Sequence, residues 1–135
     1  MTQRFDRAKT LDALDPPAWD APKYDSYLVT TCHGLRRKPI DDFSVEDLRI
    51  MIGQGIGLRF LVPIAIEVLE RDPLAQGDFY PGDLLGNVLR AGPVFWAQYP
   101  DYRSRVEAVV GDVDLPPELN EPLAAFRGKS IVPSA

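Results

Sequence analysis

The run of residues 58–71 is the feature that most limits how this chain can fold. It reads Leu-Arg-Phe-Leu-Val-Pro-Ile-Ala-Ile-Glu-Val-Leu-Glu-Arg, with Arg59, Pro63, Glu67 and Glu70 three or four residues apart. That spacing places these four positions on one narrow stripe of a helix, while nearly every other position is apolar. A helix with a single polar stripe is buried on its remaining faces. The run therefore predicts a central helix surrounded by other elements.

Pro63 is the weak point of this prediction, because a proline inside a helix removes a hydrogen bond and costs about 3 kcal/mol. We place it on the exposed stripe, where a kink disturbs the packing least. Each fully buried Leu, Ile or Val contributes roughly 1.5–3 kcal/mol. The run holds seven of these residues. Burial therefore outweighs the proline, and we expect a helix whose first turn is irregular.

The rest of the chain consists of short helical patterns separated by prolines and glycines. Capping residues or first-turn prolines introduce most of the expected helices or turns, near residues 10–14, 26–38, 44–52, 81–91, 94–96, 101–110 and 117–126. No stretch alternates convincingly as a strand does. We predict an all-α fold of about six to seven short helices, organised as a flexible arm (1–9), a single domain (10–128) and a frayed tail (129–135).

Size and charge narrow the possible partners. The chain has 135 residues, 45% of them hydrophobic, which is enough for one domain with a real core. Its net charge of −5 disfavours nucleic acid and anionic membranes and favours a basic protein. The N-terminus lacks a signal-peptide pattern, and no apolar run reaches the ~20 residues that span a bilayer. We therefore expect a cytoplasmic protein whose oligomeric state is open.

The only cysteine and the only histidine are adjacent, at Cys32 and His33. A zinc site usually needs three or four ligands, so a metal site of this kind is not expected. Neighbouring helical positions point about 100° apart, which argues against a Cys–His catalytic pair. Cys32 shares a predicted helix face with Leu28 and Leu35, and this pattern indicates a small core residue.

Three glycines before the central helix, Gly53, Gly55 and Gly57, superficially resemble a phosphate-binding loop. No strand precedes them and no Lys-Ser/Thr pair follows, as the known phosphate-binding motifs require. We interpret them as a turn between two helices. The sequence thus indicates no catalytic residue, no cofactor and no metal.

Carboxylates are the most abundant candidate functional groups. Glu67 and Glu70 share the polar stripe, which leaves open an enzyme that uses both for acid–base chemistry. Nearer the C-terminus five carboxylates follow one another without an intervening cation: Glu107, Asp112, Asp114, Glu118 and Glu121. This acidic stretch is either a solvated face or a patch that binds a basic partner.

Several motifs taken together resemble the immunity proteins of bacterial contact-dependent growth inhibition (CDI) systems. The resemblance covers roughly residues 11–89 and is carried by Tyr24-Asp25-Ser26-Tyr27-Leu28-Val29, Thr31-Cys32-His33, Lys38-Pro39, Phe43-Ser44-Val45-Glu46-Asp47-Leu48-Arg49, Ile52-Gly53-Gln54, Ile56-Gly57-Leu58, Leu61-Val62-Pro63, Leu69-Glu70, Pro73-Leu74-Ala75 and Gly77-Asp78-Phe79-Tyr80-Pro81-Gly82-Asp83-Leu84-Leu85. No single motif is specific to the family, but the set is fairly specific.

The resemblance implies a non-enzymatic protein that binds the toxic C-terminal domain of a cognate effector in the cytoplasm and blocks it. Many such toxins are nucleases, whose basic surfaces would suit the acidic balance of this chain. The alternative is a small helical adaptor that binds another partner.

Two groups of residues are the candidates for toxin contact. One is Asp78, Phe79, Tyr80 and Asp83, whose aromatic members either anchor an interface or pack their loop onto the central helix. The other is the acidic stretch, which lies where the resemblance fades and partner specificity is expected.

Overall fold

The computed structural model describes residues 5–21, 26–111 and 113–128. In this part of the chain the fold is all-α and contains no strand, which confirms the predicted class. The elements are α1 (Leu11–Leu14), α2 (Tyr27–Leu35), η1 (Ile40–Asp42), α3 (Val45–Gly53), α4 (Leu58–Arg71), α5 (Asp83–Leu89), α6 (Pro93–Gln98), α7 (Pro100–Val110), η2 (Pro117–Leu119) and α8 (Asn120–Phe126). None of the helices in these ranges is long and apolar enough to cross a membrane.

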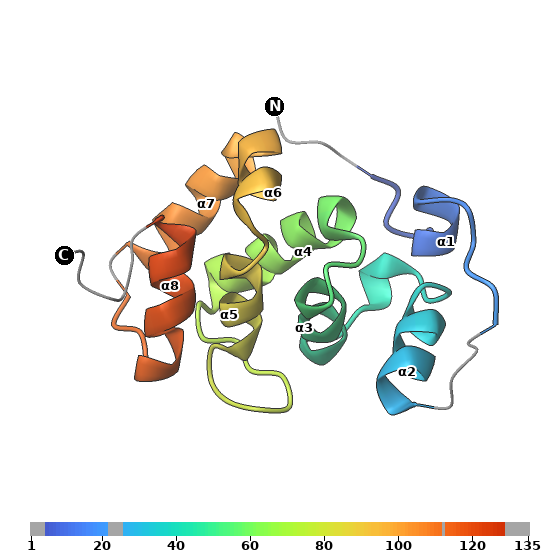
Figure 1. The fold of residues 1–135 in the computed structure, drawn as a ribbon, viewed down its shortest axis with the longest axis horizontal. Helices are drawn as coiled ribbons and strands as arrows, with labels where there is room; N and C mark the ends of the chain where they lie inside the picture. The colour runs from blue at the N-terminus through green and yellow to red at the C-terminus, as the bar shows by residue number, and fades with distance from the viewer. Residues whose placement is uncertain (1–4, 22–25, 112, 129–135) are drawn as a thin grey trace.

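Helix α4 has the predicted bounds and lies at the centre of the fold. Helices α2, α3, α5 and α8 form a row, and α4 packs against α3, α5 and α7 (Figure 1). Leu61, Ile66 and Leu69 are fully buried on α4. Burial of several such side chains, at roughly 1.5–3 kcal/mol each, makes α4 a major contributor to core stability.

The predicted caps are present at the starts of three helices. The side-chain oxygen of Ser44 accepts a hydrogen bond from the Asp47 amide, and the Asp47 carboxylate accepts one from the Ser44 amide, which completes a capping box. Ser26 caps α2 and Thr10 caps α1 in the simpler way. Local sequence therefore sets where these helices begin.

The prediction that Pro63 lies exposed on the polar stripe is wrong, because Pro63 is buried. The N-terminal segment and α7 each contribute an arginine to the stripe. Arg7 forms an ion pair with Glu67, and Nη2 of Arg105, a residue of α7, lies 2.7 Å from Glu70 Oε1. The carboxylates of the stripe are thus paired with arginines distant in sequence. Arg7 belongs to residues 5–9 of the predicted arm; residues 1–4 and the predicted tail lie outside the described residues.

Arg36 is a buried cation that joins α2 to the loop after α1. Its side chain is 2% exposed, and Nε donates a 2.7 Å hydrogen bond to Asp12 Oδ1. Nη2 donates to the backbone oxygen of Asp15 at 2.7 Å, and the guanidinium lies 4.7 Å from the centre of the Trp19 ring. Burial is the largest single influence on the Asp12 carboxyl and raises its pKa. The hydrogen bonds from Arg36 and the Trp19 amide, with the nearby arginine charges, together outweigh burial, so the pKa is lowered overall.

Replacing Arg36 with methionine should lower the free energy of unfolding by about 2–4 kcal/mol, because Asp12 and a backbone carbonyl would lose their partner. Urea denaturation followed by circular dichroism measures this change. The exposed neighbour Arg37 provides the control, and Arg37→Met should change stability by no more than about 0.5 kcal/mol. Equal stability of the two variants would show that the Arg36 contacts do not hold the loop.

Candidate functional site

The loop between α4 and α5 is organised around the buried carboxylate of Asp83. This side chain accepts hydrogen bonds from the amides of Gly77 at 2.7 Å and Phe79 at 3.0 Å. Asp83 is only 2% exposed, so it cannot serve as a surface anchor for a partner. Its position as the first residue of α5 turns the carboxylate back onto the loop that precedes the helix. The sequence reveals the acid but not this inward role.

Two residues of α3 hold the same loop from the other side. Glu46 accepts hydrogen bonds from Arg49 Nε at 2.6 Å and from the amide of Asp78 at 2.8 Å. The hydrogen bond from Arg49 is the main reason why the pKa of Glu46 is lowered. Arg49 Nε also lies 3.8 Å from Asp83 Oδ2. A chain of alternating charges therefore fixes the loop to both α3 and α5.

The other candidates in this loop divide between surface and interior. Phe79 is 69% exposed, and its ring centre lies 4.1 Å from the guanidinium of Arg49. Tyr80 is half-buried and packs against the hydrophobic core. Asp78 is exposed, and its pKa is raised, first by desolvation and then by the charge of Glu46. Asp78 and Phe79 are thus the members of this group that a partner could reach.

A groove of about 510 Å³ runs between α2, α3 and this loop. Its lining includes Tyr27, Leu28, Glu46, Arg49, Asp78 and Phe79, and we call it the α2–α3 groove. Figure 1 shows the start of α2 and the α4–α5 loop at the same lower edge of the molecule.

Two residues of the groove were missed by the sequence analysis. Tyr27 is 79% exposed and Leu28 is 41% exposed. The helical spacing placed Leu28 on the buried face, but the first turn of α2 borders the groove and not the core. Tyr27 directly follows the helix cap Ser26, and an aromatic residue in an exposed first turn was the only available signal.

The structure does not gather the acidic stretch into one patch. Glu107 lies 3.6 Å from Arg127, beyond the C-terminal end of α8, whereas Glu118 and Glu121 lie near its N-terminal end. The length of that helix, about 10 Å, separates the two ends. Asp114, Glu118 and Glu121 are exposed and form no ion pair with any described residue. We call these three the acidic edge; Asp112 lies outside the described residues.

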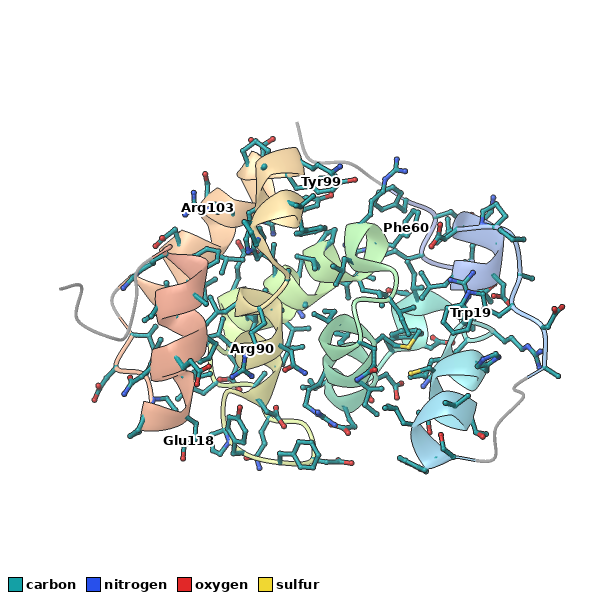
Figure 2. The ribbon with its side chains drawn as sticks, in the orientation of Figure 1. Trp19, Phe60, Arg90, Tyr99, Arg103 and Glu118 are labelled. Carbon is teal, nitrogen blue, oxygen red and sulfur yellow. The ribbon has the colours of Figure 1, made fainter. Side chains whose placement is uncertain are left out.

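Leu119, the sequence neighbour of Glu118, packs beside the α4–α5 loop. A Cβ at Gly82 would lie 2.9 Å from Leu119 Cδ1, and φ of +89° at Gly82 also favours glycine. Figure 2 shows Glu118 at the lower edge of the molecule, where the α4–α5 loop also lies. The α4–α5 loop and Glu118, which come from the two groups of candidate residues, therefore lie on the same side of the protein.

The remaining candidates have structural explanations. Cys32 is buried, as predicted for a core residue, and burial raises the pKa of its thiol. His33 packs edge-on against Trp19, with the ring centres 4.9 Å apart. Glu67 and Glu70 are paired with different arginines. The described residues contain no cluster of His, Cys, Asp and Glu that could hold a metal ion.

The Glu46 network generates a prediction for stability and its pH dependence. Glu46→Gln should lower the free energy of unfolding by about 1–2 kcal/mol at pH 7, because a neutral amide binds Arg49 less strongly. Since the pKa of Glu46 is lowered from 4.5, its contribution is complete above that pH and is lost as the pH falls. The difference between wild type and variant should therefore shrink below about pH 4.5 in acid titrations of urea stability.

Glu118→Gln is the matched control, because this carboxylate is exposed and pairs with no described residue. A wild-type–Glu46→Gln difference that stays constant down to pH 3 would contradict the stabilising role of the charge.

Comparison with known proteins defines the family. A family model for CDI immunity proteins matches residues 13–106. No curated protein matches the chain. The matched region runs from α1 into α7 and includes α3, the α4–α5 loop and α5, which together form one wall of the groove. CDI immunity proteins are non-enzymatic toxin inhibitors, so the enzyme alternative does not apply. Because the match spans well over half of the sequence, this chain belongs to the CDI immunity protein family.

Proposed function

We propose that this protein acts in the cytoplasm, where it neutralises the toxin domain encoded beside it by covering a basic, nuclease-type surface. The family match over residues 13–106 is the observation that carries this proposal, since immunity to a CDI toxin implies binding to that toxin. The net charge of −5 supports the basic character of the partner.

The acidic edge is the best candidate for the first contact with such a toxin. Its three carboxylates are exposed and unpaired among the described residues, so binding does not require an internal ion pair to be broken. Glu107 is a weaker candidate because Arg127 already lies beside it. A nuclease must attract phosphate groups, and the positive surface that does so would also attract these carboxylates.

Blocking by coverage requires more than charge. Stable protein complexes bury roughly 1,600 Å² in total, far more than three side chains supply. Exposed charges mainly raise the association rate and select the partner, while buried apolar contacts slow dissociation. The acidic edge is therefore proposed to orient the toxin, and additional surface must hold it.

Co-expression tests the function directly. The toxin domain encoded immediately upstream should stop growth when expressed alone, and this protein should restore growth and co-elute with the toxin as a one-to-one complex. Persistent killing, together with separate elution at low salt, would overturn the proposal. A complex that forms equally well at all salt concentrations would overturn the electrostatic part.

Neutralising the acidic edge should slow association with the toxin. The variant Asp114→Asn/Glu118→Gln/Glu121→Gln should reduce the association rate roughly tenfold at low salt and weaken its salt dependence, because local steering is lost. Stopped-flow or biosensor kinetics across a salt series gives both quantities.

The matched control is Asp20→Asn/Asp41→Asn/Asp42→Asn, which removes the same number of exposed charges near the α1 end, opposite α8 in Figure 1. A similar slowing in both variants would assign the effect to net charge and not to the acidic edge.

A further inference from the structure

Exposed apolar side chains concentrate around the α2–α3 groove. The described residues contain five large hydrophobic side chains that are exposed: Trp19, Tyr27, Leu28, Phe79 and Val94. Three of them, Tyr27, Leu28 and Phe79, line this one groove although they come from segments about fifty residues apart in sequence. Scattered exposed apolar residues are normal on a protein surface, but a cluster around a concavity indicates an interaction site.

The charges of the groove limit what can occupy it. Glu46 and Arg49 neutralise each other through two hydrogen bonds of 2.6 and 2.5 Å. Asp78 adds a carboxylate at the groove surface, and Asp83 lies behind Arg49 at 3.8 Å. Carboxylates therefore outnumber cations, and the complementary occupant combines an apolar group with a positive charge.

The groove is held in shape before any partner binds. Asp83 and Glu46 fix the backbone of residues 77–79 by hydrogen bonds. Asn87 Nδ2 donates a 2.8 Å hydrogen bond to the Arg49 carbonyl oxygen across the floor. A Cβ at Gly53 would lie 2.6 Å from that same nitrogen, so glycine allows α3 and α5 to approach closely here. A preformed groove loses little conformational entropy on binding, which favours affinity.

We propose that the α2–α3 groove receives an apolar side chain of the cognate toxin domain, flanked by a lysine or arginine that pairs with Asp78. This inference rests on the proposed function and adds the surface that holds the toxin after the acidic edge has oriented it. Tyr27 and Phe79 project from the rim, where aromatic residues act as anchors at protein interfaces.

A protein segment fits this groove better than a small metabolite. A small-molecule pocket encloses most of its ligand and buries its aromatic lining. Here the two rim aromatics are 79% and 69% exposed, so they can insert into a partner surface as well as receive one of its side chains. The Arg49 guanidinium beneath Phe79 keeps that ring in an orientation that favours such contact.

Single substitutions at the rim test the proposal with purified protein and the upstream-encoded toxin domain. Tyr27→Ala and Phe79→Ala should each raise the Kd about tenfold or more, chiefly through faster dissociation. Leu28→Asp should have a larger effect, because it places a charge in the apolar part of the groove. Biosensor kinetics gives the rates, and thermal melts show that each variant remains folded.

Val94→Asp is the control for Leu28→Asp, since Val94 is 74% exposed on α6 and does not line the groove. It adds the same charge and should change the Kd no more than about twofold. If wild type binds the toxin and the three groove variants bind as Val94→Asp does, the groove proposal is wrong while the proposed function stands. If wild type itself forms no complex, both are overturned.

Discussion

The burial of α4 is the constraint on which the rest of this structure depends. Its apolar faces are buried against α3, α5 and α7. Its polar stripe carries two glutamates, Glu67 and Glu70. Arg7 from the N-terminal segment and Arg105 from α7 form ion pairs with these glutamates. The same helix thus connects the N-terminal segment and α7 to one core. The exposed functional surface is left to the elements around it.

A second network converts this scaffold into a defined surface. Asp83 and Glu46 belong to α5 and α3, which are adjacent in the row. Both carboxylates accept hydrogen bonds from backbone amides of the loop between α4 and α5. A partly satisfied network of buried charges would be costly, whereas this one is paired at each step. The loop therefore keeps Phe79 at the surface even though water exposure of its ring is unfavourable. An exposed aromatic on a fixed loop is consistent with the proposed binding surface.

The sequence was a good guide wherever a feature depends on near neighbours. The bounds of α4 and the capping box at Ser44 follow from helical spacing and from residues three positions apart. It failed where the partner is distant along the chain. The main partner of Arg36 is Asp12, which belongs to another helix. The burial of Pro63 likewise depends on tertiary packing, which helical spacing does not show. For the candidate site, the sequence named Phe79 as a candidate but left open whether its ring is exposed or packed inward. It also could not reveal which carboxylates face inward.

In the proposed mechanism, the acidic edge and the α2–α3 groove act at different stages of one encounter. Exposed carboxylates act over distances up to the Debye length, roughly 8–10 Å at physiological salt, so they affect an approaching partner before contact. The groove acts only at contact, where Tyr27, Leu28 and Phe79 exclude water. Many basic proteins could be attracted by the charges alone. Under this proposal, one toxin is selected when it also presents an apolar side chain that fits the groove, with a cation placed to pair with Asp78. Charge attraction alone does not provide this selectivity.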